Sequence, residues 1–499
     1  MTLLTDARGQ PLSGATPAAL AHYERALAAS LTWRGGADAL LDAALVDAPA
    51  FTMAHVLKAW LLAGSRDVRR VRAARPWLEA AAAEPAGEHE RLHLAAIGRV
   101  LADDYEGAAA LLGRALEARP RDVLALSVAC GIDHLGGQAE QQRARIERVL
   151  PAWPGDLPGW HSVRAMHAFA LAECGHYAQA EQSAHAALAL DEGDARAHHA
   201  MAHVFEMTDR PAAGARWMNA NRQHWSHGTA VAAHCWWHLA LFRLAQGDDA
   251  AALAVYDERL RAADPGDLSA LFDAAALLWR LRLRGVDGGA RWAALADAWA
   301  PHVDDAFCIF NDLHAMLAFV GAHDWARAQA LERTLLRSRQ RPTRHGESAR
   351  QLGLAACRGV MAFGRGDLPQ AITLLASLPA QAHRLGGSHA QRDVMHLTLL
   401  AALEAVRRPA RRAARGVACR PARQHSIQDS PSHEVRSPCR LPRFLRTACP
   451  VESSAVKTPS LLLSLSTFVI ALVCAALLVV SPPDAAQTTQ LHLATTSLL

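Results

Sequence analysis

Lysine is nearly absent from this chain of 499 residues, in which Lys58 and Lys457 stand against 50 arginines. This strong preference for arginine over lysine indicates the codon usage of a GC-rich genome. The arginine count alone therefore does not indicate nucleic-acid binding. The charge distribution agrees, because residues 1–405 hold 40 basic and 44 acidic residues. A mildly acidic body is not expected to attract nucleic acid through its electrostatic field, so we expect no nucleic-acid partner.

β-branched residues are sparse, and the body's few cysteines are scattered without a CxxC pair. The abundance of Ala, Leu and Arg beside so little Val, Ile and Thr argues against a sheet protein. Isolated cysteines exclude a disulfide framework and suit free thiols in a reducing compartment. Residues 1–17 contain no apolar stretch long enough for a signal peptide. We therefore expect a cytoplasmic, helical body.

Internal repetition is what the sequence has instead. Segments with a Gly or Asp turn followed by small residues begin at Asp103, Gly175, Gly247, His323 and Gly366. Small side chains at this spacing let two helices approach closely, as in tetratricopeptide repeats of roughly 34 residues. No segment alternates with a period of two. The sequence therefore predicts an all-α fold, a tetratricopeptide-like α-solenoid of stacked helical hairpins over residues 18–405, after an N-terminal extension of residues 1–17. Amphipathic first helices are expected at 160–174, 194–207, 231–246, 267–283, 307–321 and 345–364.

Polar residues at one repeat phase are the candidates for a site, because first helices line the concave side of such a solenoid. Two i, i+4 pairs dominate this set, His199 with His203 and, 35 residues later, His234 with His238. Each pair projects from one side of its helix. Continuing the phase predicts a ligand-binding groove whose other members are Glu206, Trp236, Trp237, Asp273, Asn311, Asp312, His314, Gln391, Arg392 and Asp393.

A metal is one of three roles that these histidines fit. His199, His203 and Glu206 form an H-x3-H-x2-E pattern on one helix face, and His234 with His238 completes a shell for zinc or iron. Against a metal, the HExxH arrangement is absent, and no cysteine has ligand-like spacing. We therefore expect no metal and no cofactor, with His199, His203, Glu206 and His238 as the ligands if a metal does bind.

The other two roles are structural and catalytic. A histidine in the interior often only bonds a neighbouring carboxylate or carbonyl group. For catalysis, His203 or His314 beside Asp273 or Asp312 fits general acid–base work. No Ser or Cys stands in a nucleophile motif, so we expect a protein that is not an enzyme. In the turn at 386–393, a helix cap by Ser388 and a salt bridge fit better than a phosphate loop.

The same residues resemble the tetratricopeptide-repeat protein 38 family. The matching stretches include His199-x3-His203-x2-Glu206-Met207, the HCWWH motif at 234–238, FND-x-H at 310–314 and GGSHAQRDV at 386–394. Generic tetratricopeptide consensus does not contain these polar residues, and the similarity runs in order over residues 20–405. Cys235 is a departure, since the family tends to have Asn there. The resemblance implies an all-helical repeat protein and supplies no activity.

The C-terminal part departs from the family pattern. Residues 406–458 are rich in Arg and Pro and predict a disordered basic linker. Residues 459–481 predict one apolar helix, in which the uncharged stretch 461–480 is long enough to span a membrane with its N-terminal side cytoplasmic. A polar tail, 482–499, follows. Two origins fit this C-terminal sequence: a genuine membrane anchor, or a reading-frame error near Val406. We favour the second, so a membrane is expected as a partner only if the segment is genuine.

Two functions fit the predicted groove. The preferred one is a cytoplasmic scaffold that binds a peptide, a protein partner or a small ligand on its concave side. The alternative is an enzyme or metal-dependent protein that uses the histidines and carboxylates of the same groove.

Overall fold

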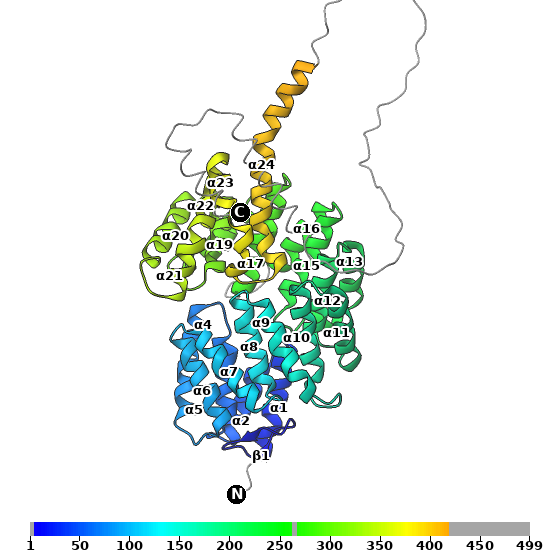
Figure 1. Cartoon of the computed structure of the whole chain (residues 1–499), viewed down its shortest axis with the longest axis vertical. Coiled ribbons are helices and arrows are strands. Elements are labelled where there is room, and N and C mark those ends of the chain that lie inside the picture. Colours follow the sequence, from blue (N-terminus) through cyan, green and yellow to red (C-terminus); the bar gives the residue numbers. More distant parts are fainter. Residues whose placement is uncertain (1–3, 262–266, 419–499) are drawn as a thin grey trace, which may run out of the picture. The chain divides into compact units, whose positions relative to one another are not determined.

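The computed structural model describes residues 4–261 and 267–418, and these residues are almost entirely helical (Figure 1). The chain opens with a short antiparallel hairpin of β1 (Leu4–Thr5) and β2 (Pro11–Leu12). The helices of the first half are α1 (Pro17–Leu31), α2 (Ala37–Asp47), α3 (Thr52–Ala63), α4 (Val68–Ala73), α5 (Arg75–Ala82), α6 (Glu88–Leu101), α7 (Tyr105–Ala118), α8 (Val123–Leu135), α9 (Ala139–Val149) and the 3-10 turn η1 (Leu150–Ala152).

The second half continues as helices without strands in the described residues. Its elements are α10 (Trp160–Glu173), α11 (Tyr177–Leu190), α12 (Ala195–Met207), α13 (Pro211–Ala220), α14 (Arg222–Trp225), α15 (Ala232–Ala245), α16 (Asp249–Val255), η2 (Tyr256–Leu260), α17 (Leu268–Leu283), α18 (Arg291–Trp299), η3 (Ala300–His302), α19 (Ile309–Gly321), α20 (Trp325–Ser338), α21 (Arg344–Ser348), η4 (Ala349–Gly353), α22 (Leu354–Arg365), α23 (Leu368–Leu375), η5 (Pro379–Leu385) and α24 (His389–Ala418).

A recurring turn separates the helices of a pair. One residue takes a left-handed backbone, as Gly247 (φ 80°) and Gly366 (φ 79°) do, and the aspartate after it caps the next helix. Asp248 accepts a hydrogen bond from the backbone of α16, and Asp367 does the same for α23. Glycine adopts this backbone without steric cost, and an aspartate oxygen satisfies a free N–H group at the helix start. The Gly/Asp motif that repeats in the sequence therefore corresponds to this turn between two helices.

The first helices of the pairs lie where the sequence predicts them. The ranges of α10, α12, α15, α17 and α19 agree with the expected ranges to within two residues at each end. The expected helix at 345–364 is instead interrupted by η4, a π-turn. The interruption coincides with close packing, because a Cβ on Gly353 would lie 1.9 Å from Cδ1 of Ile309.

Both ends of the described chain differ from the prediction. Residues 1–17 were expected to be an extension without strands, but two-residue strands are too short to show any alternation in sequence. Helix α24 continues to Ala418, whereas residues 406–458 were predicted to be disordered. Ala and Arg dominate this stretch and both favour helix, which explains the continuation. The rest of that segment, the apolar residues 459–481 and the tail 482–499 lie outside the described residues.

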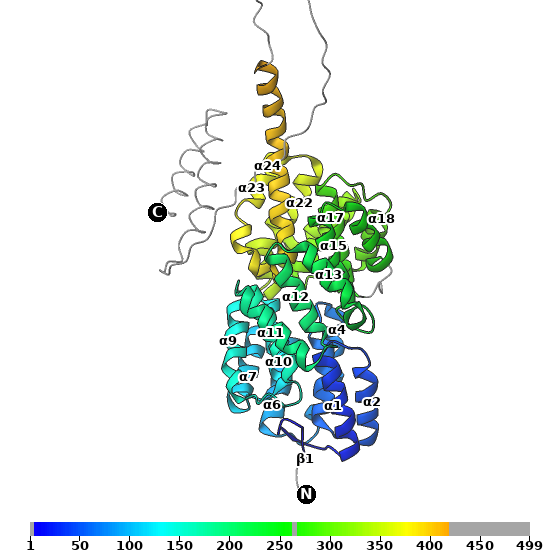
Figure 2. The same cartoon turned by 90° about the vertical axis from the view of Figure 1, so that its right-hand side faces the viewer.

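The apolar side chains form two large cores. One joins buried residues between Leu12 and Ala170, and the other joins residues between Ala168 and Leu399. Figure 2 shows α24 packed on α17, α22 and α23 before it extends beyond them. No helix among residues 4–261 and 267–418 is long and apolar enough to cross a membrane, and the candidate span 461–480 falls outside those ranges.

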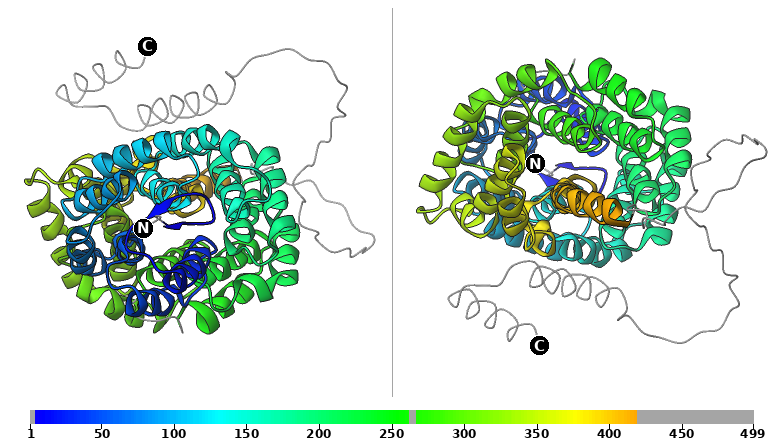
Figure 3. Two further views of the ribbon diagram at one scale, coloured as in Figure 1. Left: turned by 90° about the horizontal axis from the view of Figure 1, so that it is seen from below. Right: turned by 90° about the horizontal axis from the view of Figure 1, so that it is seen from above.

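Helices far apart in sequence also contact one another. Figure 3, viewed along the long axis, shows the described helices arranged in a ring, and Figure 1 shows the β1–β2 hairpin at one end of them. Asn311 of α19 donates a hydrogen bond to the Arg66 carbonyl oxygen (2.9 Å), and Arg344 pairs with Asp103 (3.2 Å). These contacts bring later helices against earlier ones, so side chains on the inner faces are covered.

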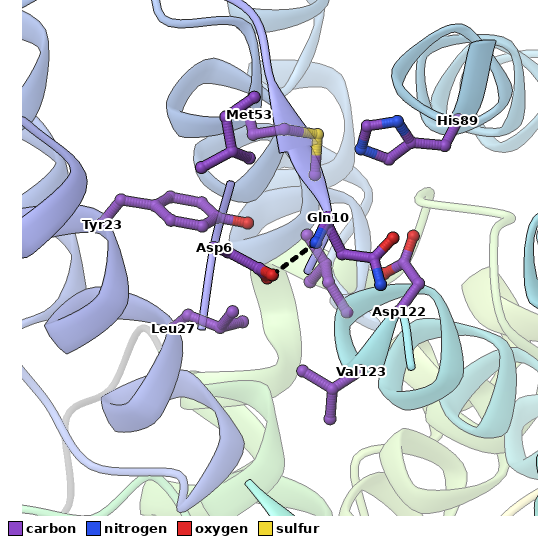
Figure 4. Close-up of a pocket in the computed structure, with 10 residues that line it drawn as sticks. Asp6, Gln10, Tyr23, Leu27, Met53, His89, Asp122 and Val123 are labelled. Carbon is purple, nitrogen blue, oxygen red and sulfur yellow. Dashed lines mark hydrogen bonds between the residues drawn. The ribbon is translucent and has the colours of Figure 1, made fainter. Parts of the chain in front are cut away.

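A small cavity lies between the hairpin, α1 and α8 (Figure 4). Asp6, Tyr23, His89 and Asp122 line it, and so does Gln10, which directly precedes β2 and donates its backbone N–H to Asp6 (2.7 Å). The cavity has room for about one water molecule. It is too small for a substrate and is not a candidate active site.

Candidate metal centre

The two histidine pairs meet in the interior, between α12 and α15. His199, His203, His234 and His238 each offer a ring nitrogen, and these four nitrogens all lie within 4.8 Å of one another. The closest pair is Nε2 of His203 and Nε2 of His199, at 2.9 Å. Spacing i, i+4 on each helix and one repeat between the helices therefore bring four imidazoles to one point.

The outward nitrogens of the cluster face carboxylates. Nδ1 of His234 lies 2.9 Å from Asp273, and Nδ1 of His238 lies 3.0 Å from Glu206. An ionised carboxylate accepts hydrogen bonds only, so it holds the proton on Nδ1 and leaves the Nε2 lone pair pointing inward. Nδ1 of His203 faces a third carboxylate, Glu173, at 3.8 Å.

The cluster is largely buried, and burial favours the neutral form of His199, His203 and His238. Burial, and then the nearby histidines, hold the pKa of His199 and of His203 well below the usual value of 6.5. Burial also depresses the pKa of His238, helped by His234 and Arg280. Only His234 retains appreciable exposure, with 14% of its side chain accessible. Neutral imidazole is the form that binds metal ions.

The carboxylates behind the cluster are themselves in a poorly solvated place. Burial raises the pKa of Glu206 to about 7, against the neighbouring charges of Arg280 and His234. Burial likewise raises the pKa of Asp273, against hydrogen bonds from His234 and Gln391. A divalent cation beside these groups favours their ionised form.

Aromatic rings enclose the cluster. Phe169 of α10 stacks on His199 with ring centroids 5.4 Å apart, and it meets His203 edge-on at 5.1 Å. Trp237 stacks on His234 at 5.2 Å. These rings limit water access and fix the orientation of the imidazoles.

Helix α24 reaches the cluster through Glu173. The backbone N–H and Nδ1 of His389 lie 3.1 and 3.0 Å from Glu173, and Arg392 lies 3.6 Å from it. Arg392 also donates to the Gly387 carbonyl oxygen. The hydroxyl of Ser388 accepts a 3.4 Å bond from the backbone N–H three residues later, which fits the expected cap and salt bridge. The turn at 386–393 therefore orders the acid that faces His203.

Three of the predicted groove residues lie elsewhere. Asn311 bonds a backbone carbonyl oxygen, as described above. His314 donates Nδ1–H to the Phe310 carbonyl oxygen of its own helix (2.7 Å). Asp312 accepts from Nε2 of His345 (2.6 Å), whose Nδ1 accepts from the Ser338 hydroxyl (2.6 Å). These three residues of α19 therefore bond other groups of the fold and take no part in the cluster.

Trp236 and Asp393 are also separate from the cluster. Trp236 meets Trp225 edge-on at 4.9 Å and lies between two arginine side chains, whereas its neighbour Trp237 points to the histidines. Asp393 is exposed. The predicted residues that the structure does bring together, as cluster or surrounding shell, are His199, His203, Glu206, His234, Trp237, His238, Asp273, Gln391 and Arg392.

Sequence reasoning missed three of the residues at the cluster, Glu173, Phe169 and Trp33. Glu173 did carry a signal, because it precedes Glu206 by 33 residues, about one repeat, and so holds the same phase on the preceding first helix. Glu206 was predicted as a metal ligand, but it lies behind His238. No protein-family model matches this chain, so the family resemblance stays a prediction.

Proposed function

We propose that this protein is metal-dependent and that the four histidines bind one divalent transition-metal ion, zinc being the first candidate. The observation that carries the proposal is the convergence of four imidazoles, three of which turn an outward nitrogen toward a carboxylate. Imidazole suits zinc, copper, nickel and iron, whereas calcium and magnesium prefer oxygen. A carboxylate behind each ligating imidazole is the usual outer shell of such sites.

The distances fit a tetrahedral ion after small side-chain rotations. Zinc–nitrogen bonds of about 2.05 Å put neighbouring nitrogens about 3.3 Å apart in a tetrahedral site. The His199–His203 pair is slightly closer than this, at 2.9 Å, and the widest separation among the four is 4.8 Å. Shifts of less than about 1 Å per ring bring all four nitrogens to bonding distance.

Core packing alone accounts poorly for this arrangement. Nε2 of His238 and Nδ1 of His203 are buried without a hydrogen-bond partner in the described residues. An unsatisfied buried polar atom costs about 1–3 kcal/mol. A metal ion takes up the inward lone pair of His238 and fixes the imidazole tautomers, so it removes that part of the cost, whereas Nδ1 of His203 faces Glu173.

We further propose that the helix pairs form a tetratricopeptide-like α-solenoid, as the resemblance implies. The recurring left-handed residue followed by a capping aspartate supports this, as does the pairing of consecutive helices. The repeats then act as a rigid frame for the metal ion. We do not place a peptide-binding groove at the histidines, because His203 and His238 are fully buried.

Metal analysis of the purified full chain tests the proposal. We expect about one zinc, or another first-row ion, per chain, and less than a tenth of that in His203→Ala and His238→Ala. Two matched controls, His345→Ala for a buried histidine outside the cluster and His396→Ala for an exposed one, keep the full content. A wild-type chain that stays metal-free after dialysis against zinc contradicts the proposal.

A further inference from the structure

A cation lies beside the histidine cluster, over an aromatic ring that contacts it. The guanidinium of Arg196 lies 4.2 Å from the ring centroid of Trp33. The Trp33 ring in turn lies 5.6 Å from the ring of His199. Arg196 precedes His199 by three residues on α12, so the two side chains share a face of that helix.

Arg196 is held in place but not neutralised. Nε donates to the Leu31 carbonyl oxygen (2.5 Å) and Nη2 to the Ser127 hydroxyl (3.2 Å). Within residues 4–261 and 267–418, no carboxylate oxygen lies within 4.0 Å of this guanidinium. Burial lowers the pKa of Arg196 to about 10, against the charge of Asp194, so the group stays cationic at neutral pH. A partly desolvated cation with no carboxylate oxygen within 4.0 Å is unfavourable, and an oxyanion relieves it through paired hydrogen bonds.

A second arginine near the cluster shows the contrast. Arg280 lies over Trp237 at 5.4 Å, but it donates to backbone carbonyl oxygens, including that of Ala390 (2.5 Å). The charges of Asp393 and Glu206 also face it. Arg280 therefore belongs to the shell behind the histidines. Arg196, by contrast, has N–H donors that no carboxylate of the described residues accepts.

Trp33 is positioned by a strained backbone. Its φ is 57°, in the left-handed region that costs a tryptophan free energy. Contacts on both sides hold it there, because Ala230 donates to the Trp33 carbonyl oxygen (2.7 Å) and Gly35 donates to that of Gly228 (3.0 Å). Such strain persists where the surroundings over-determine it, and it gathers at ligand sites.

Side chains beside the cluster, Arg196 among them, are partly exposed. His199, His203 and His238 are buried, whereas a set of neighbouring side chains is partly exposed. We call this set of partly exposed residues the rim; its members are Trp33, His134, Phe169, Arg196 and His234. A small ligand arriving at the rim meets the Arg196 guanidinium and the one partly exposed imidazole of the cluster, that of His234.

We infer that an oxyanion, as a carboxylate or phosphate group of a small substrate, binds Arg196 against Trp33 on the His199 side of the metal centre. The inference rests on the proposed function, because it names the substrate class of that site. The arginine and the metal ion then both attract the anion, and the indole ring of Trp33 forms one wall for the rest of the molecule.

Calorimetric titration of the zinc-loaded full chain with inorganic phosphate and, separately, with acetate tests this at constant ionic strength. We expect binding of at least one anion, and which of them binds tells carboxylate from phosphate. Arg196→Gln weakens the binding at least ten-fold, and Arg196→Lys weakens it less. Arg210→Gln, which removes an arginine already paired with Glu181 (2.8 Å), leaves it unchanged.

The outcomes separate this inference from the proposed function. Equal affinity in the wild type and in Arg196→Gln overturns the inference, as does the absence of binding for both anions, even if zinc is bound. Anion binding that depends on Arg196 in a chain that takes no zinc rejects the metal and leaves the oxyanion site standing. If Arg196→Gln does not fold, judged by circular dichroism, the wild-type titration and the Arg196→Lys variant decide.

Discussion

The buried histidine His345 and the four-histidine cluster differ in one respect, the partners of their ring nitrogens. His345 has both ring nitrogens satisfied, one by Asp312 and the other by Ser338, each at 2.6 Å. In the four-histidine cluster, carboxylates accept from the outward nitrogens of His234 and His238, and the inward nitrogens turn toward one another. A histidine that is saturated by its own protein is structural, whereas converging lone pairs need something that the chain does not supply.

The largest expected effect comes from breaking the saturated group. His345→Ala leaves the Asp312 carboxylate buried without its donor, and we expect a loss of about 3–5 kcal/mol in the free energy of unfolding. The zinc content stays at the wild-type value. Denaturant unfolding with parallel metal analysis measures both quantities. Loss of zinc in His345→Ala would show that His345 and the four-histidine cluster are coupled, which would contradict the distinction between them.

Zinc itself should stabilise the chain through the cluster alone. A free zinc concentration of about a thousand times Kd adds about 4 kcal/mol to the free energy of unfolding, because only the folded chain presents the four nitrogens together. Thermal unfolding with zinc and with a chelator measures this difference. His203→Ala abolishes the difference, while His396→Ala, on an exposed position of α24, preserves it. A wild-type unfolding temperature that does not respond to zinc contradicts the assignment.

The carboxylates behind the cluster provide a finer test. Glu206→Gln keeps an acceptor for Nδ1 of His238 but removes the negative charge, and we expect zinc affinity to fall about 10–100-fold. Competition with a chromophoric chelator gives the affinity. Glu181→Gln serves as a control, because that acid pairs with Arg210 outside the cluster. An unchanged affinity in Glu206→Gln would place Glu206 outside the shell of the metal.

The smallest effect concerns His161, a partly exposed histidine that lies 2.8 Å from Asp194 and 3.8 Å from Asp191. Burial lowers the pKa of His161, but the hydrogen bond (2.8 Å) and charge of Asp194 outweigh it and raise the pKa above 6.5. A raised pKa stabilises the fold fully below about 6.5. The contribution is lost as the pH rises through the folded-state value.

The unfolding free energy of the wild type should therefore fall more between pH 6 and pH 8 than that of His161→Gln. The difference between the two slopes isolates His161, because the other titrating groups are common to both chains. We expect a difference within about 1 kcal/mol, since one-fifth of the side chain is exposed. Parallel slopes would mean that Asp194 caps α12 without help from this histidine.

The all-helical fold and the bounds of the first helices were predictable from local signals. Turn glycines and capping aspartates act within a few residues, and apolar periodicity acts within a helix, so the sequence displays them directly. The β1–β2 hairpin and the π-turn η4 were not predictable. Each depends on a partner elsewhere, such as Ile309 against Gly353, that local sequence does not reveal.

The candidate site was predictable in part. Repeat phase brought His203 and His238 together correctly, because a constant repeat length keeps one face in register. The same extrapolation failed for Asn311 and His314, which bond backbone groups near them. Trp33 had no signal at all, since it arrives from another part of the chain through the contacts of a single turn.

The amino-acid sequence by itself determined that this protein is helical, where its first helices lie and that imidazoles recur one repeat apart, because these properties depend on neighbours in the chain. Only the tertiary structure decided that Glu173, Glu206 and Asp273 stand behind those imidazoles and that Trp33 and Arg196 stand beside them. Those contacts arise from how helices pack across long separations, and packing is a property of the whole folded chain.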